Sequence, residues 1–125
     1  MYICLLGINI STMKTHLPAA SEHISNYLSD FKEVAINHYG KRLKQLVLYG
    51  SYARGDHYPG SDIDVLVVIN NLESEAREID TLAGLKTDLL LEYGIYLSTN
   101  PVDSEKFEQS RFSFFRNVKR EGVLL

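Results

Sequence analysis

Two short polar motifs, each adjoining an apolar run, are the residues of this chain whose types and spacing could do chemistry. Gly50 and Ser51 follow one apolar run, and after ten intervening residues Asp62 and Asp64 open another. Glycine lets the backbone approach a ligand closely, and the first N–H groups of a following helix are free to bind an anion. The serine hydroxyl adds a donor. We interpret Gly50 and Ser51 as a phosphate-binding turn; the alternative is an ordinary surface turn.

The two aspartates are spaced as a pair on one face of a strand, because side chains at i and i+2 point the same way. Adjacent carboxylates repel each other unless a cation offsets their charge. Mg²⁺ is typically held by one or two carboxylates together with substrate phosphates. Every residue from Val65 to Ile69 is apolar, so a fully solvated face is a poor description of this strand. We therefore interpret Asp62 and Asp64 as metal-binding and catalytic residues.

Together the motifs are more specific than either alone. The string GSYARG…SDIDVLVV resembles the minimal nucleotidyltransferases, a small bacterial branch of the DNA polymerase beta-like nucleotidyltransferase superfamily, and the resemblance covers roughly residues 20–122. It implies that Gly50 and Ser51 cradle the β- and γ-phosphates of ATP and that Asp62 and Asp64 ligate Mg²⁺. Arg54 would then offset phosphate charge as part of the nucleotide-binding site; the alternative is an exposed arginine or a structural ion pair.

The same resemblance implies a protein partner. The chain is similar to the antitoxin half of bacterial HEPN–MNT toxin–antitoxin pairs, in which AMP is attached to a tyrosine of a helical HEPN-type ribonuclease. AMPylation of a partner hydroxyl is therefore the expected activity. Two alternatives remain: a catalytically impaired module that binds nucleotide or masks a partner, and nucleotidyl transfer to a small-molecule hydroxyl. The chain has almost nothing beyond the core to hold such a small molecule.

One position departs from the pattern of active members, which usually carry a third carboxylate on the next strand. We expect that strand at residues 95–98, with Tyr96 at the carboxylate position. A neutral phenol, with an ordinary pKa near 10, is a poor Mg²⁺ ligand. Glu92 and Asp103 flank the strand but do not align with the position. The departure predicts nucleotide and metal binding more firmly than catalysis.

The elements that must position these residues can be read from hydrophobic spacing. Apolar residues recur at i, i+3, i+4 and i+7 over residues 18–39, which predicts an amphipathic helix ended by Gly40. Residues 43–49 form a dense apolar run, predicted as a strand. Residues 62–69 are apolar on both faces beyond the aspartates, which is typical of a central strand covered on both sides.

The second half of the chain is also predicted to alternate between helices and strands. Residues 73–92 have helical spacing and precede Gly94, after which a short third strand is predicted and is expected to break at Pro101. A helix is expected to start at Ser104, and residues 117–125 are expected to continue as helix and fray. The fold class is therefore α/β (α+β), a small mixed β-sheet with helices packed on it.

The aromatic residues of the tail allow two interpretations. Phe107, Phe112 and Phe115 are expected to pack onto the domain's own sheet. The alternative is contact with a partner, because aromatic and arginine side chains are enriched at interface anchors.

Length and charge set the remaining limits. The chain has 125 residues and is expected to form a single domain, with residues 1–15 as a loosely attached extension and Met1 or Met13 as the true start. The net charge of −3 argues against gripping nucleic acid by its phosphates. The apolar run at residues 1–10 is too short to span a membrane and follows no basic segment. The single cysteine, Cys4, fits a reducing cytoplasm.

Overall fold

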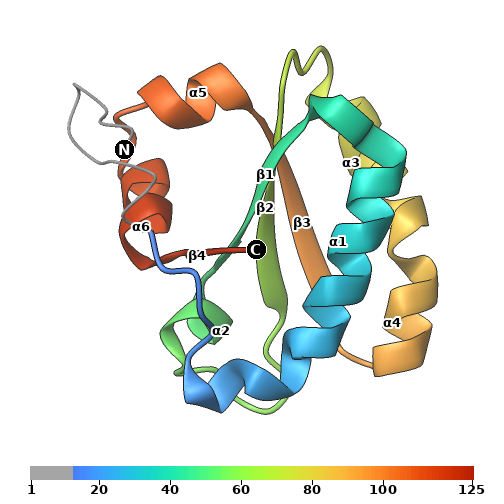
Figure 1. Cartoon of the computed structure of the whole chain (residues 1–125), viewed down its shortest axis with the longest axis vertical. Coiled ribbons are helices and arrows are strands. Elements are labelled where there is room, and N and C mark those ends of the chain that lie inside the picture. Colours follow the sequence, from blue (N-terminus) through green and yellow to red (C-terminus); the bar gives the residue numbers. More distant parts are fainter. Residues whose placement is uncertain (1–12) are drawn as a thin grey trace.

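A four-stranded sheet carries the motif residues in the computed structural model, which describes residues 13–125. Its strands lie in the order β3-β2-β1-β4. Strands β2 and β3 run parallel, whereas β1 is antiparallel to both of its neighbours. The predicted fold class, a small mixed sheet with helices packed on it, is confirmed (Figure 1). The strand bounds are β1 Leu43–Tyr49, β2 Ile63–Ile69, β3 Leu97–Asp103 and β4 Val123–Leu124.

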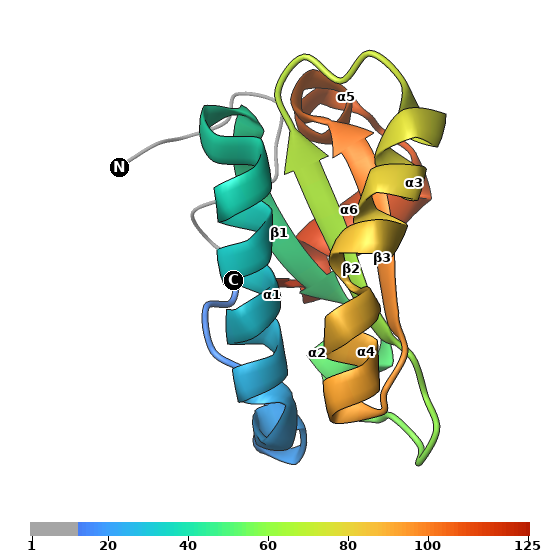
Figure 2. The same cartoon turned by 90° about the vertical axis from the view of Figure 1, so that its right-hand side faces the viewer.

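One face of the sheet is covered by α1 (Ser25–Tyr39), α3 (Glu75–Leu85) and α4 (Thr87–Tyr93), as Figure 2 shows. These amphipathic helices bury the larger of two apolar clusters against the sheet. Fully buried aromatic rings from α1 fill its centre, so removal of apolar area from water holds this layer in place.

The other face is covered only in part, by α5 (Ser104–Gln109) and α6 (Ser113–Glu121) (Figure 1). The smaller apolar cluster lies under these two helices. Its members are Met13, Val47, Leu66, Val68, Val102, Phe107, Phe115 and Val118. Phe107 and Phe115 therefore pack on the domain's own sheet as expected, whereas Phe112 is 69% exposed, so its expected packing is wrong.

The elements that flank the motifs agree closely with the sequence prediction. The expected helix begins as the 3₁₀ turn η2 (Ala19–Ile24), continues as α1, and is followed by a second 3₁₀ turn, η3 (Gly40–Arg42). Strand β1 has the predicted bounds, and β2 starts one residue later than predicted. Each helix within residues 13–125 is too short or too polar to cross a membrane.

The predicted long helix at residues 73–92 is wrong in one respect, since it is divided into α3 and α4 at Lys86. The Lys86 ammonium donates to the Leu97 carbonyl at 2.6 Å and to the Thr99 hydroxyl at 3.1 Å. This tertiary anchoring to β3, together with the weak helix propensity of nearby Gly84, explains the break.

The predicted third strand is also wrong in its bounds. Strand β3 runs through Pro101 to Asp103 instead of ending before the proline. Because β3 is an edge strand, the proline's missing N–H can face away from the sheet without removing a ladder hydrogen bond. The strand therefore carries polar residues past the point where the sequence suggested that it stops.

The end of the chain differs from the expected fraying helix. Helix α6 ends before Gly122, and Val123 and Leu124 pair with β1 as strand β4. A two-residue strand is too short to leave a period in the sequence. Lys14 forms a bridge with Val123, and Met13 is buried, so the packed part of the chain includes both. The predictions about Cys4 and the remaining N-terminal residues lie outside the described residues.

Two phenylalanines offer a matched test of this core. We expect Phe107→Ala to lower the free energy of unfolding by about 3–5 kcal/mol, because it empties a fully buried site. Phe112→Ala removes the same side chain from an exposed site and should change stability by less than about 0.5 kcal/mol. Urea unfolding of both variants measures the difference, and equal losses would contradict the assigned packing.

Candidate functional site

The Gly-Ser motif forms the turn between β1 and the one-turn helix α2 (Ser51–Arg54). Gly50 precedes this helix with a φ of 77°, a backbone conformation that residues with a Cβ rarely adopt. The first N–H groups of a helix have no intrahelical partner. Within residues 13–125 the Ser51 hydroxyl makes no hydrogen bond. The turn therefore presents unpaired donors, as phosphate binding requires.

The turn lies against the second motif. A Cβ atom added at Gly50 would lie 2.6 Å from the Asp64 Oδ2 atom, so the backbone of the turn and this carboxylate are in direct proximity. Tyr49 is the register partner of Asp64 across the antiparallel β1–β2 pair. The structure thus brings together Gly50 and Asp64, which are far apart in sequence.

The two aspartates differ in exposure. Asp62 is exposed just before β2, whereas Asp64 is half-buried within it. Burial, and then the charge of Asp62, raise the pKa of the Asp64 carboxyl, while the charge of Arg54 lowers it. Within residues 13–125 neither carboxylate forms a hydrogen bond or an ion pair. Their repulsion is incompletely offset by the protein, and a divalent cation would offset it.

The donor set of this pair fits Mg²⁺, which accepts one or two carboxylates and completes its coordination with phosphate oxygens and water. Among residues 13–125 there is no cluster of three or more histidine, cysteine, aspartate or glutamate side chains placed to hold a metal. The described chain would therefore supply Asp62 and Asp64 to the ion, and the nucleotide would supply much of the rest.

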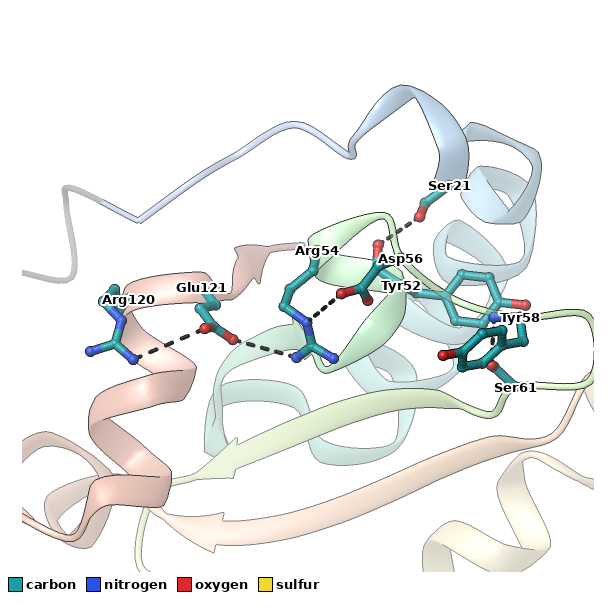
Figure 3. A network of polar contacts seen from close by, with 8 residues as sticks. All are labelled: Ser21, Tyr52, Arg54, Asp56, Tyr58, Ser61, Arg120 and Glu121. Atoms are coloured by element: carbon teal, nitrogen blue, oxygen red, sulfur yellow. Dashed lines mark hydrogen bonds and ion pairs between the residues drawn. The ribbon is translucent and has the colours of Figure 1, made fainter.

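Arg54 makes structural ion pairs, the alternative raised for it above. Its Nε atom donates to Asp56 Oδ2 at 3.1 Å, and its Nη1 atom lies 3.5 Å from Glu121 Oε2, as Figure 3 shows. In the same view, the Ser21 hydroxyl donates to the Tyr52 carbonyl at 2.6 Å and ties η2 to α2. The role of Arg54 in nucleotide binding stays a prediction.

The third strand begins two residues later than predicted, which decides the β3 residue that lies beside Asp64. In the observed register, Asp64 lies beside Ser98, and Tyr96 precedes β3 with its ring 5.0 Å from the Lys86 ammonium. Asp103 lies at the other end of β3, where it caps α5 through the Glu105 N–H. The β3 side chains on the Asp64 face near this site are therefore neutral.

Two of the neighbouring polar residues were missed by sequence reasoning. Tyr49 directly precedes the Gly-Ser turn, and Asn100 lies two residues beyond Ser98 on β3. The Asn100 side-chain amide donates a hydrogen bond to the Tyr49 hydroxyl. Extending the strand alternation by two residues past Ser98 would have placed Asn100 on the face of Asp64.

A pocket of about 590 Å³ also opens beside Asp62, a volume typical of ligand-binding clefts. Aromatic side chains from η2, α2 and the following loop line much of it, and the His57 ring stacks on Tyr52 with centroids 3.9 Å apart. No periodic pattern in the sequence indicates this pocket, because its walls come from separate elements.

The close contact at Gly50 can be tested against a matched glycine. Gly50→Ala should lower the free energy of unfolding by about 1–2 kcal/mol more than Gly60→Ala. Both positions have positive φ, but the new Cβ meets Asp64 only at position 50, since nothing lies within 4 Å at position 60. Urea unfolding measures this, and equal losses would show that the carboxylate moves aside without cost.

The raised pKa of Asp64 predicts a pH-dependent stability. The folded protein holds the Asp64 proton more tightly than the unfolded chain does. This preference stabilises the fold at low pH, and the stabilisation is lost as the pH rises from 3.8 through the raised pKa of Asp64. Asp64→Asn should therefore become progressively more stable than wild type from about pH 4 to pH 7 in metal-free buffer. Asp80→Asn, at an exposed position of α3, is the control. A difference that shrinks with rising pH would contradict the assignment.

Comparison with known proteins places these features in a family. Residues 28–119 match the family described as "Nucleotidyltransferase domain". Two relatives come from Methanocaldococcus jannaschii. "Putative protein adenylyltransferase MJ0604" is 36% identical over 99 residues, covering 78% of this chain and 93% of the relative. "Putative protein adenylyltransferase MJ0141" is 33% identical over 105 residues, covering 80% and 96%.

Solved structures agree at the level of the fold. A structure described as a "putative nucleotidyltransferase from Sulfolobus solfataricus" has a TM-score of 0.61 at 16% identity and covers 84% of this chain and 81% of its own. A structure described as "toxin-antitoxin with AMP-PNP" has a TM-score of 0.52 at 18% identity and covers 76% and 69%. The sequence match extends over most of the chain and includes both motifs, and the chain belongs to the nucleotidyltransferase domain family.

Proposed function

We propose that this nucleotidyltransferase is Mg²⁺-dependent and transfers AMP from ATP to a hydroxyl group of a partner protein. The observation that carries the proposal is the proximity of the Gly50 turn to the Asp64 carboxylate. An anion-binding turn beside two carboxylates whose charge is only partly offset suits a metal-bound triphosphate. The names of the relatives as protein adenylyltransferases support AMP as the transferred group and protein as the acceptor.

In this proposal each motif has a separate task. The N–H groups after Gly50 and the Ser51 hydroxyl bind the β- and γ-phosphates, and Asp62 and Asp64 hold Mg²⁺. The ion would neutralise phosphate charge and polarise the transferred phosphoryl group. The acceptor hydroxyl releases its proton to water as its oxygen bonds to the α-phosphorus, the bond from this phosphorus to the bridging oxygen breaks, and pyrophosphate leaves.

The proposed partner is a helical protein of the HEPN type, and the proposed location is the cytoplasm, where ATP is supplied. The resemblance to HEPN–MNT antitoxins motivates this choice, and the structural neighbour described as a toxin-antitoxin with AMP-PNP supports a partner and a nucleotide without identifying the type of partner. Phe112 and Phe114 are exposed around the start of α6 and offer apolar anchors for a protein surface. The net charge of −3 makes nucleic acid a poor candidate for the acceptor.

Transfer can be tested with ATP labelled on the α-phosphate. Incubation with Mg²⁺ and the product of the neighbouring gene should place label on that protein, with a mass gain of one AMP. Asp62→Ala and Asp64→Ala should each lower labelling by at least about 10²-fold, because the metal loses a ligand. Asp80→Ala, on the opposite helical layer, is the control and should label the partner normally.

A complex that forms without a mass gain would contradict the proposed transfer and would favour the partner-masking alternative. The neutral β3 residues beside Asp64 are the specific observation in favour of that alternative. Labelling that persists in both aspartate variants would contradict the assigned metal site.

A further inference from the structure

We propose that Tyr49 is a catalytic residue, whose hydroxyl donates a hydrogen bond to the transferred phosphoryl group, and that Asn100 is the residue that positions it. This inference rests on the proposed nucleotidyl transfer and adds a contact that neither motif contains.

The location of the pair follows from the register of the sheet. On the face that carries Asp64, the row nearer α5 and α6 is apolar and belongs to the smaller core cluster: Val47, Leu66, Val68 and Val102. The next row, toward the Gly50 turn, carries Tyr49, Asp64 and Ser98, and Asn100 lies beside Leu66 in register. A nucleotide bound at Gly50 and Asp64 would therefore lie beside Tyr49 and Asn100.

The tyrosine ring reaches across the central strand. Tyr49 belongs to β1 and Asn100 to β3, so the hydrogen bond between their side chains crosses β2, where Asp64 lies. The Phe114 ring packs edge-on against Tyr49, with centroids 5.5 Å apart, and restricts its position. The hydroxyl is therefore held near the metal-binding carboxylate by contacts from two other elements.

The direction of this hydrogen bond leaves Tyr49 with a proton to donate. The Asn100 amide is the donor and the Tyr49 oxygen is the acceptor. Within the described part of the chain, the Tyr49 hydroxyl has no other hydrogen-bond partner. A phenol with an ordinary pKa near 10 keeps its proton at neutral pH. The O–H group is thus available to an oxygen of a bound ligand.

The chemical need for such a donor lies in the transfer step. As the acceptor oxygen bonds to the α-phosphorus and pyrophosphate leaves with the bridging oxygen, negative charge is spread over the non-bridging oxygens. A fixed donor aimed at one of them stabilises the transition state, whereas Tyr49 itself keeps its proton throughout. Removal of one such donor typically lowers kcat by about 10²- to 10³-fold.

Asn100 can be tested by a substitution that keeps its shape. In Asn100→Asp the carboxylate can only accept, so the Tyr49 proton turns toward residue 100 and away from the phosphoryl group. We expect Asn100→Asp and Tyr49→Phe each to lower kcat for pyrophosphate release by about 10²-fold and to raise the KM for ATP by only about 3-fold. Because both changes remove one interaction, the double variant should be no slower than either single variant.

Tyr93→Phe is the matched control, since it also removes a tyrosine hydroxyl that hydrogen-bonds a neighbour, Asp30, but on the opposite face of the sheet. Its kcat should equal that of wild type. Thermal melting of all variants should show small changes, because Asn100 is exposed and Tyr49 is only partly buried.

Binding measurements separate this inference from the proposed function. In the presence of Mn²⁺, Tyr49→Phe should bind α,β-methylene-ATP about 3-fold more weakly than wild type does. Both proteins should bind inorganic tripolyphosphate equally well, because tripolyphosphate has no phosphoryl group that carries a nucleoside. Wild type that binds both but transfers nothing contradicts the proposed function, and the binding comparison still tests Tyr49. Unchanged analogue affinity in Tyr49→Phe, or an Asn100→Asp variant that turns over as fast as wild type or faster, would overturn the inference.

Discussion

The contact between the Gly50 backbone and the Asp64 carboxylate is the constraint on which the site depends. A Cβ at position 50 would lie 2.6 Å from Oδ2, so either the turn or the carboxylate would have to shift. The antiparallel pairing of β1 and β2 sets this contact, since it aligns Tyr49 with Asp64 and brings the following turn alongside. An error of one residue in that register would turn the aspartates to the other face of the sheet.

The same contact concentrates negative charge in a partly buried place. Burial and the neighbouring Asp62 raise the pKa of the Asp64 carboxyl, and Arg54 offsets this only in part because it is also paired with Asp56 and Glu121. Such an arrangement lowers stability in the free protein and favours a bound cation. It is the kind of strain that binding sites retain, because the ligand supplies the missing charge.

The architecture of the sheet explains why this charge remains accessible. Three helices cover one face along its length, whereas α5 and α6 cover only part of the other (Figures 1 and 2). The end that lies beyond their apolar row holds Asp64 together with neutral hydrogen-bonding groups from β1 and β3. The proposed nucleotide site thus lies at the edge of a core whose packing fixes its walls, and the fold is that of the nucleotidyltransferase domain family.

The sequence alone determined the parts that depend on neighbours along the chain. Hydrophobic spacing predicted α1, β1 and β2, and the two motifs indicated the family and the two halves of the site, because these signals are local. The tertiary structure decided what depends on distant partners. Pro101 is tolerated because β3 lies at the sheet edge, and β4 exists because β1 is there to pair with it. The bond between Asn100 and Tyr49 joins residues 51 positions apart, and no local pattern records such a contact.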